Sequence, residues 1–113
     1  MQQVRLVLVG LGHLGRRLCQ ILHDKREHVR RRYGLDLVLI GAADSRGAAY
    51  DPVNGLDPEQ VVALKTSGAS IADYPDVGKR DWLAATLVAT AQADVLLEAS
   101  PVNLDEGAEP GLS

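Results

Sequence analysis

Three glycines near the N-terminus stand at the spacing of a dinucleotide-binding turn. Gly10, Gly12 and Gly15 form a Gly-x-Gly-x-x-Gly motif directly after an apolar segment. Glycine permits the tight turn at the first position, close approach of the backbone to a pyrophosphate at the second, and close helix–strand packing at the third. Free N–H groups at the start of the following helix would bind the diphosphate. The alternative is an ordinary strand–turn–helix corner. The predicted cofactor-binding residues of this turn are Gly10, Leu11, Gly12, His13, Leu14 and Gly15.

An acidic residue stands where the second strand of such a unit would end. Asp44 follows the apolar segment 35–43, and an acid at this place accepts hydrogen bonds from the adenosine ribose hydroxyls. An acid there favours NAD, whereas Ser45 and Arg46 would suit the 2′-phosphate of NADP. The sequence therefore leaves the choice between NAD and NADP open, with a lean to NAD. The alternative is an Asp-Ser turn whose side chain binds its own backbone.

A third group of candidate residues follows the apolar segment 93–100. The carboxyl ends of parallel strands lie at one edge of an open α/β sheet, and ligands bind at that edge. Backbone groups here would line the nicotinamide ribose, and an asparagine would hydrogen-bond the ribose or the carboxamide. A plain Pro-Asn turn explains the same residues equally well. The candidates are Ala99, Ser100, Pro101 and Asn103.

The sequence offers no convincing catalytic group. His13 occupies a variable position of the glycine motif, and Lys65 and Lys79 do not follow predicted strands. The single Cys19 has no partner for a disulfide, and it leaves a zinc cluster implausible. We therefore predict a binding unit with no catalytic residue and no metal site of its own.

The elements that would position these groups alternate between strand and helix. The period of the apolar residues and the Gly34 stop signal predict strand, helix, strand in the first 43 residues. Later helices are predicted from an Asp57 cap to near Gly68 and from an Asp81 cap to near Gln92. The resulting fold class is α/β, a Rossmann-like parallel sheet with flanking helices and about three strands in the order 2-1-3. The predicted strands span 4–9, 35–43 and 93–100, the first helix 13–31, the domain 1–104, and a loosely ordered tail 105–113.

Length and composition exclude several other classes of protein. A chain of 113 residues forms one domain, and it has no run of about 18 apolar residues that would cross a membrane. The N-terminus enters a strand directly, without a secretory segment, so we expect a cytoplasmic protein. Residues 1–46 carry nine Lys and Arg against four Asp and Glu. Aromatic residues for base stacking are scarce, however, so nucleic-acid binding is not expected.

Taken in order, these motifs resemble the N-terminal domain of homoserine dehydrogenases. The resemblance covers nearly the whole chain, and its most specific part combines the glycine motif with Asp-Ser-x-Gly and Glu-x-Ser-Pro-x-Asn. The four matching segments are 10–16, 43–47, 57–65 and 93–104.

The resemblance implies an NAD(P)-dependent oxidoreductase that interconverts L-homoserine and L-aspartate 4-semialdehyde in threonine and methionine biosynthesis. It also implies a dimer, and it carries the cofactor role over to Gly10, Gly12, Gly15, 44–46 and 100–101. The catalytic lysines and the substrate-binding domain of that family would lie outside these residues. We therefore expect the chain alone to bind cofactor without turnover, and its uncovered third strand to promote self-association. The alternative is a stand-alone dinucleotide-sensing module.

Overall fold

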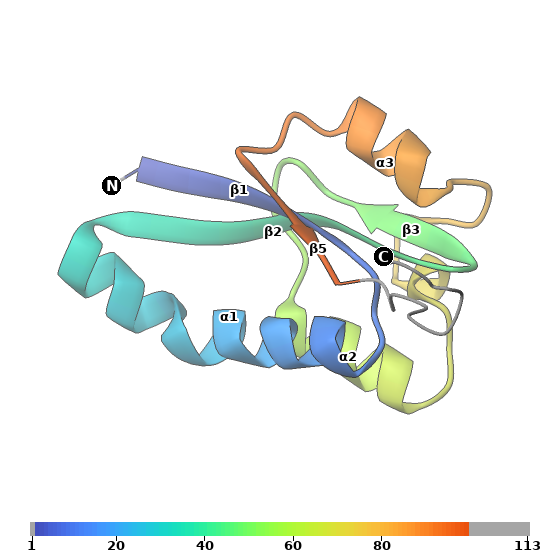
Figure 1. Cartoon of the computed structure of the whole chain (residues 1–113), viewed down its shortest axis with the longest axis horizontal. Helices are drawn as coiled ribbons and strands as arrows, with labels where there is room; N and C mark the ends of the chain where they lie inside the picture. Colours follow the sequence, from blue (N-terminus) through green and yellow to red (C-terminus); the bar gives the residue numbers. More distant parts are fainter. Residues whose placement is uncertain (1, 100–113) are drawn as a thin grey trace, which may run out of the picture.

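The chain folds into a mixed sheet with helices on both faces (Figure 1). The computed structural model describes residues 2–99. Helices α1 (His13–Tyr33) and α2 (Pro58–Thr66) cover one face of the sheet, and α3 (Ala84–Thr90) covers the other. The elements in chain order are β1 (Gln2–Val9), α1 (His13–Tyr33), β2 (Leu35–Asp44), β3 (Gly47–Tyr50), α2 (Pro58–Thr66), the 3-10 helix η1 (Ile71–Asp73), β4 (Gly78–Lys79), α3 (Ala84–Thr90) and β5 (Val95–Glu98).

The sheet has the strand order β4-β3-β2-β1-β5. Strand β1 lies in the centre and pairs in parallel with β2 and with β5. The predicted 2-1-3 order of the three parallel strands is therefore confirmed. The predicted number of about three strands was wrong, because β3 turns back to pair antiparallel with β2, and β4 pairs antiparallel with β3. Both added strands are short and lack β-branched residues, so they carry little strand signal.

Helix α1 lies where the sequence predicts it, whereas α3 begins later than predicted. Helix α1 ends at Tyr33 because Gly34 adopts a left-handed φ of 68° and donates its N–H to the carbonyl of Arg30 at 3.0 Å. Helix α3 begins at Ala84 rather than at the predicted Asp81 cap, and its N-terminus has no side-chain cap. The intervening Trp82 packs on Tyr50 instead, with ring centroids 5.9 Å apart.

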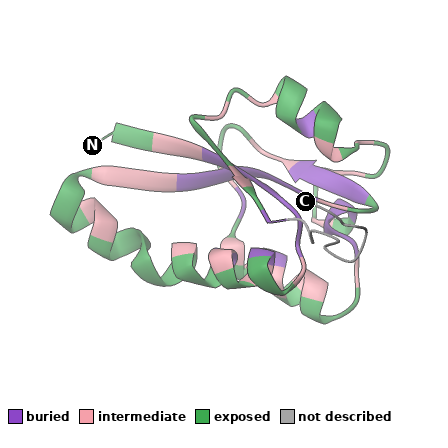
Figure 2. Cartoon of the chain, in the orientation of Figure 1, coloured by how far each residue is buried: buried purple, intermediate pink, exposed green. Residues whose placement is uncertain are grey.

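Buried residues lie mainly along the strands (Figure 2), and their side chains form one apolar group on each face of the sheet. Leu8 of β1 and Val61 of α2 are buried on one face, and Val7 of β1 and Leu87 of α3 on the other. Cys19 is fully buried among the first group, and burial raises the pKa of its thiol to about 11. The turn that follows β1 is therefore attached to a strand that is packed on both faces.

No helix among residues 2–99 is long and apolar enough to span a bilayer.

Candidate cofactor-binding cleft

A cleft of about 560 Å³ opens where β1 and β2 end. The turn between β1 and α1 forms one wall, and the end of β2 forms another. Helix α2 and the start of α3 close its sides. The lining residues are Val9, Gly10, Leu11, Gly12, Ala43, Asp44, Ser45, Lys65, Leu83 and Ala84.

The glycines of the turn have different physical roles. Gly10 has a left-handed φ of 97°, and its N–H donates to the carbonyl of Ala43 at 2.9 Å, which ties the turn to β2. A Cβ on Gly15 would overlap the carbonyl oxygen of Gly10, so this glycine is needed for the fold. Among residues 2–99, no atom other than those of Gly12 and its two chain neighbours lies within 4 Å of a Cβ placed on Gly12. The fold therefore leaves the space at Gly12 open to a ligand.

The N-terminus of α1 is available to an anion. Its N-cap residue is Gly12, no side chain of the described residues caps its amides, and its first turn contains no acid. Helix α2 shows the contrast, because Asp57 caps it and Glu59 lies in its first turn. The backbone amides of the first turn can donate hydrogen bonds to a pyrophosphate. The positive end of the dipole of the 21-residue α1 favours the same negative charge. The residues present therefore fit a dinucleotide.

Asp44 lies at the centre of a hydrogen-bond network within the protein. Its Oδ2 accepts the Lys65 ammonium at 2.8 Å and the Ile71 N–H at 2.7 Å. Its Oδ1 accepts the N–H groups of Arg46 and Gly47 at 2.8 and 3.0 Å, and the Ser70 hydroxyl at 3.3 Å. The side chain is only 6% exposed. We call this arrangement the Asp44 network.

The Asp44 network keeps a carboxylate charged at the base of the cleft. Burial raises the pKa of Asp44, but hydrogen bonds from Lys65, Ile71 and Arg46 outweigh burial, and the net shift is downward. The bonds to Arg46 and Gly47 form the Asp turn that the sequence offered as the alternative. Both carboxylate oxygens thus already accept donors from the protein. Binding of ribose hydroxyls by Asp44 stays a prediction.

Lys65 is the one charged residue among the cleft-lining residues that the sequence analysis missed, a group that also includes Val9, Ala43, Leu83 and Ala84. Its ammonium pairs with Asp44, and its side chain is 16% exposed. The position carried no signal because Lys65 lies within a helix rather than at a strand end. Leu83 and Ala84 were missed for a related reason, since the segment before α3 was expected to be helical.

The other predicted site residues that the structure describes do not line the cleft. His13 and Leu14 line a separate depression beside α2, and Arg46 is exposed. Ala99 is buried beside the cleft-lining Val9, and its N–H donates to the Val9 carbonyl at 2.7 Å. Ser100, Pro101 and Asn103 lie outside the described residues. The cofactor roles of all these residues stay predictions.

Known proteins resemble this chain in sequence and in structure. No family model matches the chain. The homoserine dehydrogenase of Methanocaldococcus jannaschii is 30% identical over 102 residues, which cover 90% of this chain and 30% of that protein. The NAD(+)-dependent homoserine dehydrogenase of Pseudomonas canavaninivorans is 28% identical over 113 residues, covering 100% of this chain and 32% of that protein.

A solved structure has the same fold. A hyperthermophilic archaeal homoserine dehydrogenase in complex with NADPH superposes with a TM-score of 0.74 at 23% identity, over 94% of this chain and 30% of that one. The relatives and structural neighbours of the chain are thus homoserine dehydrogenases, of which it matches a fragment. The chain spans about 30% of the length of the curated relatives it matches.

Proposed function

We propose that this chain is the cofactor-binding portion of an NAD(P)-dependent homoserine dehydrogenase, the enzyme that interconverts L-homoserine and L-aspartate 4-semialdehyde. The observation that carries the proposal is the N-terminus of α1, which no side chain among residues 2–99 caps and which has space beside Gly12 within that part of the chain. Both curated relatives are homoserine dehydrogenases, and this chain matches about the same fraction of each, 30% and 32% of its length. A cytoplasmic location, expected from the sequence, belongs to the same proposal.

The residues of the cleft bind and orient the dinucleotide in this proposal. Backbone amides at the start of α1 hold the pyrophosphate, and Leu11, Leu83 and Ala84 form apolar walls. When bound, the nicotinamide ring supplies or accepts the hydride of the reaction. Hydride transfer also needs a substrate held in reactive geometry. Because we assign no substrate-binding or catalytic residue to this chain, we expect it to bind cofactor without turnover.

The Asp44 network bears on the choice between the two cofactors. Its negative charge is offset by Lys65 at 2.8 Å, so the carboxylate repels a 2′-phosphate less than a free acid would. The sequence favoured NAD over NADP because of the acid at this position. That preference is weaker once Lys65 offsets the charge of Asp44. We therefore expect NADH and NADPH both to bind.

We also propose that the outer edge of β5 pairs with further protein. Strand β5 is the edge strand of the sheet that residues 2–99 form. Its Val95 and Leu96 point to opposite faces and are 40% and 48% exposed, and Val88 of α3 is also 40% exposed. An uncovered parallel strand with apolar side chains on both faces is unusual, because parallel sheets are normally covered on both sides. The remainder of a longer enzyme, or a second copy of this chain, would cover this edge.

Calorimetric titration with NADH and NADPH tests the proposed function. Gly12→Val places a side chain in the space reserved for the pyrophosphate and should abolish binding of both cofactors, while the loss of an N-cap glycine costs only about 1 kcal/mol of stability. Ala63→Val, on the exposed surface of α2 outside the cleft, is the matched control and should bind as the unmodified chain does. Equal binding by Gly12→Val and the unmodified chain would contradict the proposal.

A further inference from the structure

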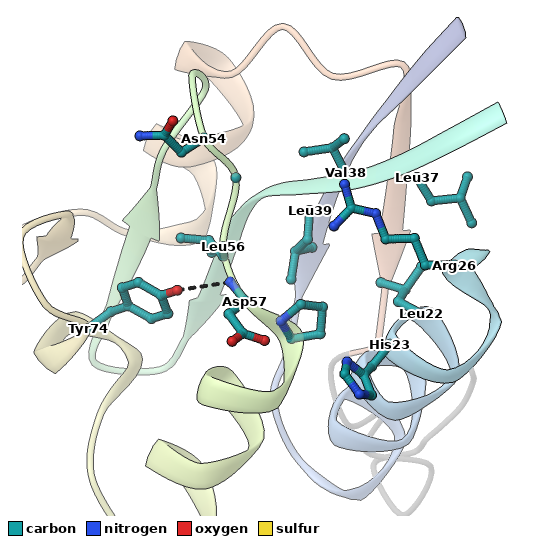
Figure 3. A pocket seen from close by; sticks show the side chains of 12 residues that line it. Leu22, His23, Arg26, Leu37, Val38, Leu39, Asn54, Leu56, Asp57 and Tyr74 are labelled. Carbon is teal, nitrogen blue, oxygen red and sulfur yellow. Dashed lines mark hydrogen bonds between the residues drawn. The ribbon is translucent and has the colours of Figure 1, made fainter. Parts of the chain in front are cut away.

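A second hollow, of about 380 Å³, lies between α1, β2 and the segment that leads into α2 (Figure 3). It shares no lining residue with the cofactor-binding cleft. Leu37, Leu39 and Leu56 supply apolar lining, and His23 of α1 and Asp57 before α2 are polar groups of its wall. Neither polar group has a role in the proposed cofactor function.

Three exposed side chains of types that can bind a metal ion converge beside this hollow. The Nε2 atom of His23 lies 3.4 Å from Oε2 of Glu59. Together with a carboxylate oxygen of Asp57, these ligand atoms all lie within 4.8 Å of one another. The imidazole comes from α1 and the two carboxylates from the start of α2, so the tertiary fold brings the donors together.

The geometry suits a first-row divalent ion. Zinc binds histidine nitrogen and carboxylate oxygen at about 2.0–2.2 Å, so two ligands of one tetrahedral ion lie about 3.4 Å apart. The His23–Glu59 pair already has this separation. Asp57 uses Oδ1 to accept the Glu59 N–H at 3.0 Å. Within residues 2–99 its Oδ2 accepts no hydrogen bond, so it is available for coordination while the helix cap remains in place.

The local charges favour a cation as well. Two carboxylates balance the charge of a divalent ion, and a neutral imidazole adds a nitrogen donor. Arg26 also lines the hollow, but Asp36 holds its guanidinium through two hydrogen bonds of 2.8 and 3.2 Å. The repulsion that Arg26 would exert on a metal ion is therefore reduced.

We propose that His23, Asp57 and Glu59 bind a divalent transition-metal ion, of which Zn²⁺ is the best match. Three protein ligands leave at least one coordination position for water or a small anionic ligand, as in open zinc sites. His23 and Asp57 both line the hollow, so this position adjoins a cavity of about 380 Å³. The proposed site shares no lining residue with the dinucleotide cleft, and it is an alternative to the sequence-based expectation of no metal site.

Titration of the full chain with Zn²⁺ near neutral pH, by calorimetry and by competition with a chromophoric chelator, tests this site. We expect one Zn²⁺ per chain, and we expect His23→Gln and Glu59→Gln each to weaken binding by more than about tenfold. Asp57→Asn should also weaken binding, and because asparagine is an equally good N-cap residue, the helix should be retained. Co²⁺ should give visible absorption bands whose intensity reports tetrahedral coordination.

Two other histidines provide matched controls. His28, exposed on the same helix, and His13, exposed at its first turn, lie outside the cluster. His28→Gln and His13→Gln should leave zinc binding unchanged. The proposal is overturned if no saturable binding occurs below about 1 mM Zn²⁺, or if either control weakens binding as much as His23→Gln does.

Discussion

Replacing Asp44 by asparagine should destabilise the fold rather than merely weaken cofactor binding. The carboxylate is 6% exposed and accepts the Lys65 ammonium at 2.8 Å and the Ile71 N–H at 2.7 Å. An asparagine amide keeps one acceptor oxygen and places an NH₂ donor among groups that are themselves donors. It also leaves the Lys65 ammonium, which is 16% exposed, without its counter-charge.

The expected loss in the free energy of unfolding follows from these contacts. Removing one member of a buried ion pair costs about 3–5 kcal/mol, and partial exposure of Lys65 places this case at about 3 kcal/mol. Small domains have a free energy of unfolding of about 5–15 kcal/mol, so the variant should still fold. Asp24→Asn, on the exposed surface of α1, is the control and should change stability by less than about 0.5 kcal/mol.

Urea unfolding followed by circular dichroism measures this effect. A double-mutant cycle with Lys65→Met isolates the energy of the Asp44–Lys65 pair, which should be the largest pairwise part of the loss. The reasoning is refuted if Asp44→Asn unfolds at the same urea concentration as the unmodified chain and loses only NADH affinity. In that case the carboxylate serves the ribose hydroxyls and not the fold.

Three further predictions concern the turn, the response to acid and the sheet edge. Gly15→Ala should lower stability by more than about 2 kcal/mol because its Cβ overlaps a backbone carbonyl, whereas Gly12→Ala should cost less than about 1 kcal/mol; equal thermal unfolding of the two variants would contradict this. Because the folded-state pKa of Asp44 is lowered, its contribution to stability is present above the unfolded pKa of about 3.9 and is lost as pH falls through the folded value. A urea series across pH should show this loss in the unmodified chain and not in Asp44→Asn. Leu96→Lys at the exposed β5 edge should reduce self-association in sedimentation experiments without changing NADH affinity; unchanged association would exclude this edge as the interface.

Local signals explain which parts of the structure the sequence could predict. The glycine motif, the apolar β1 segment and the Gly34 stop each act within a few residues, and they placed β1, α1 and β2 correctly. Strand β3 was missed because its Gly-Ala-Ala-Tyr sequence pairs only through the tight turn at the end of β2. The predicted start of α3 at Asp81 was wrong: Trp82, the next residue, packs on Tyr50, a distant contact that no local pattern indicates, and the helix begins at Ala84.

The candidate site shows the same division between local and distant interactions. The open position at Gly12 follows from a motif that is contiguous in sequence. The partners of Asp44, by contrast, include Lys65 and Ile71, which lie 21 and 27 residues further along the chain. No local pattern indicates such contacts, because they form only when α2 and η1 pack beside the end of β2.

Amide chemical-shift mapping of the isotope-labelled chain during titration with NADH and NADPH tests the central claim most directly. The account predicts saturable shifts at the 10–15 turn, at 43–45 and at Lys65, with His23 and its neighbours unaffected. Absence of saturable shifts with both cofactors, or shifts centred away from the N-terminus of α1, would contradict the assignment of this cleft as the dinucleotide site.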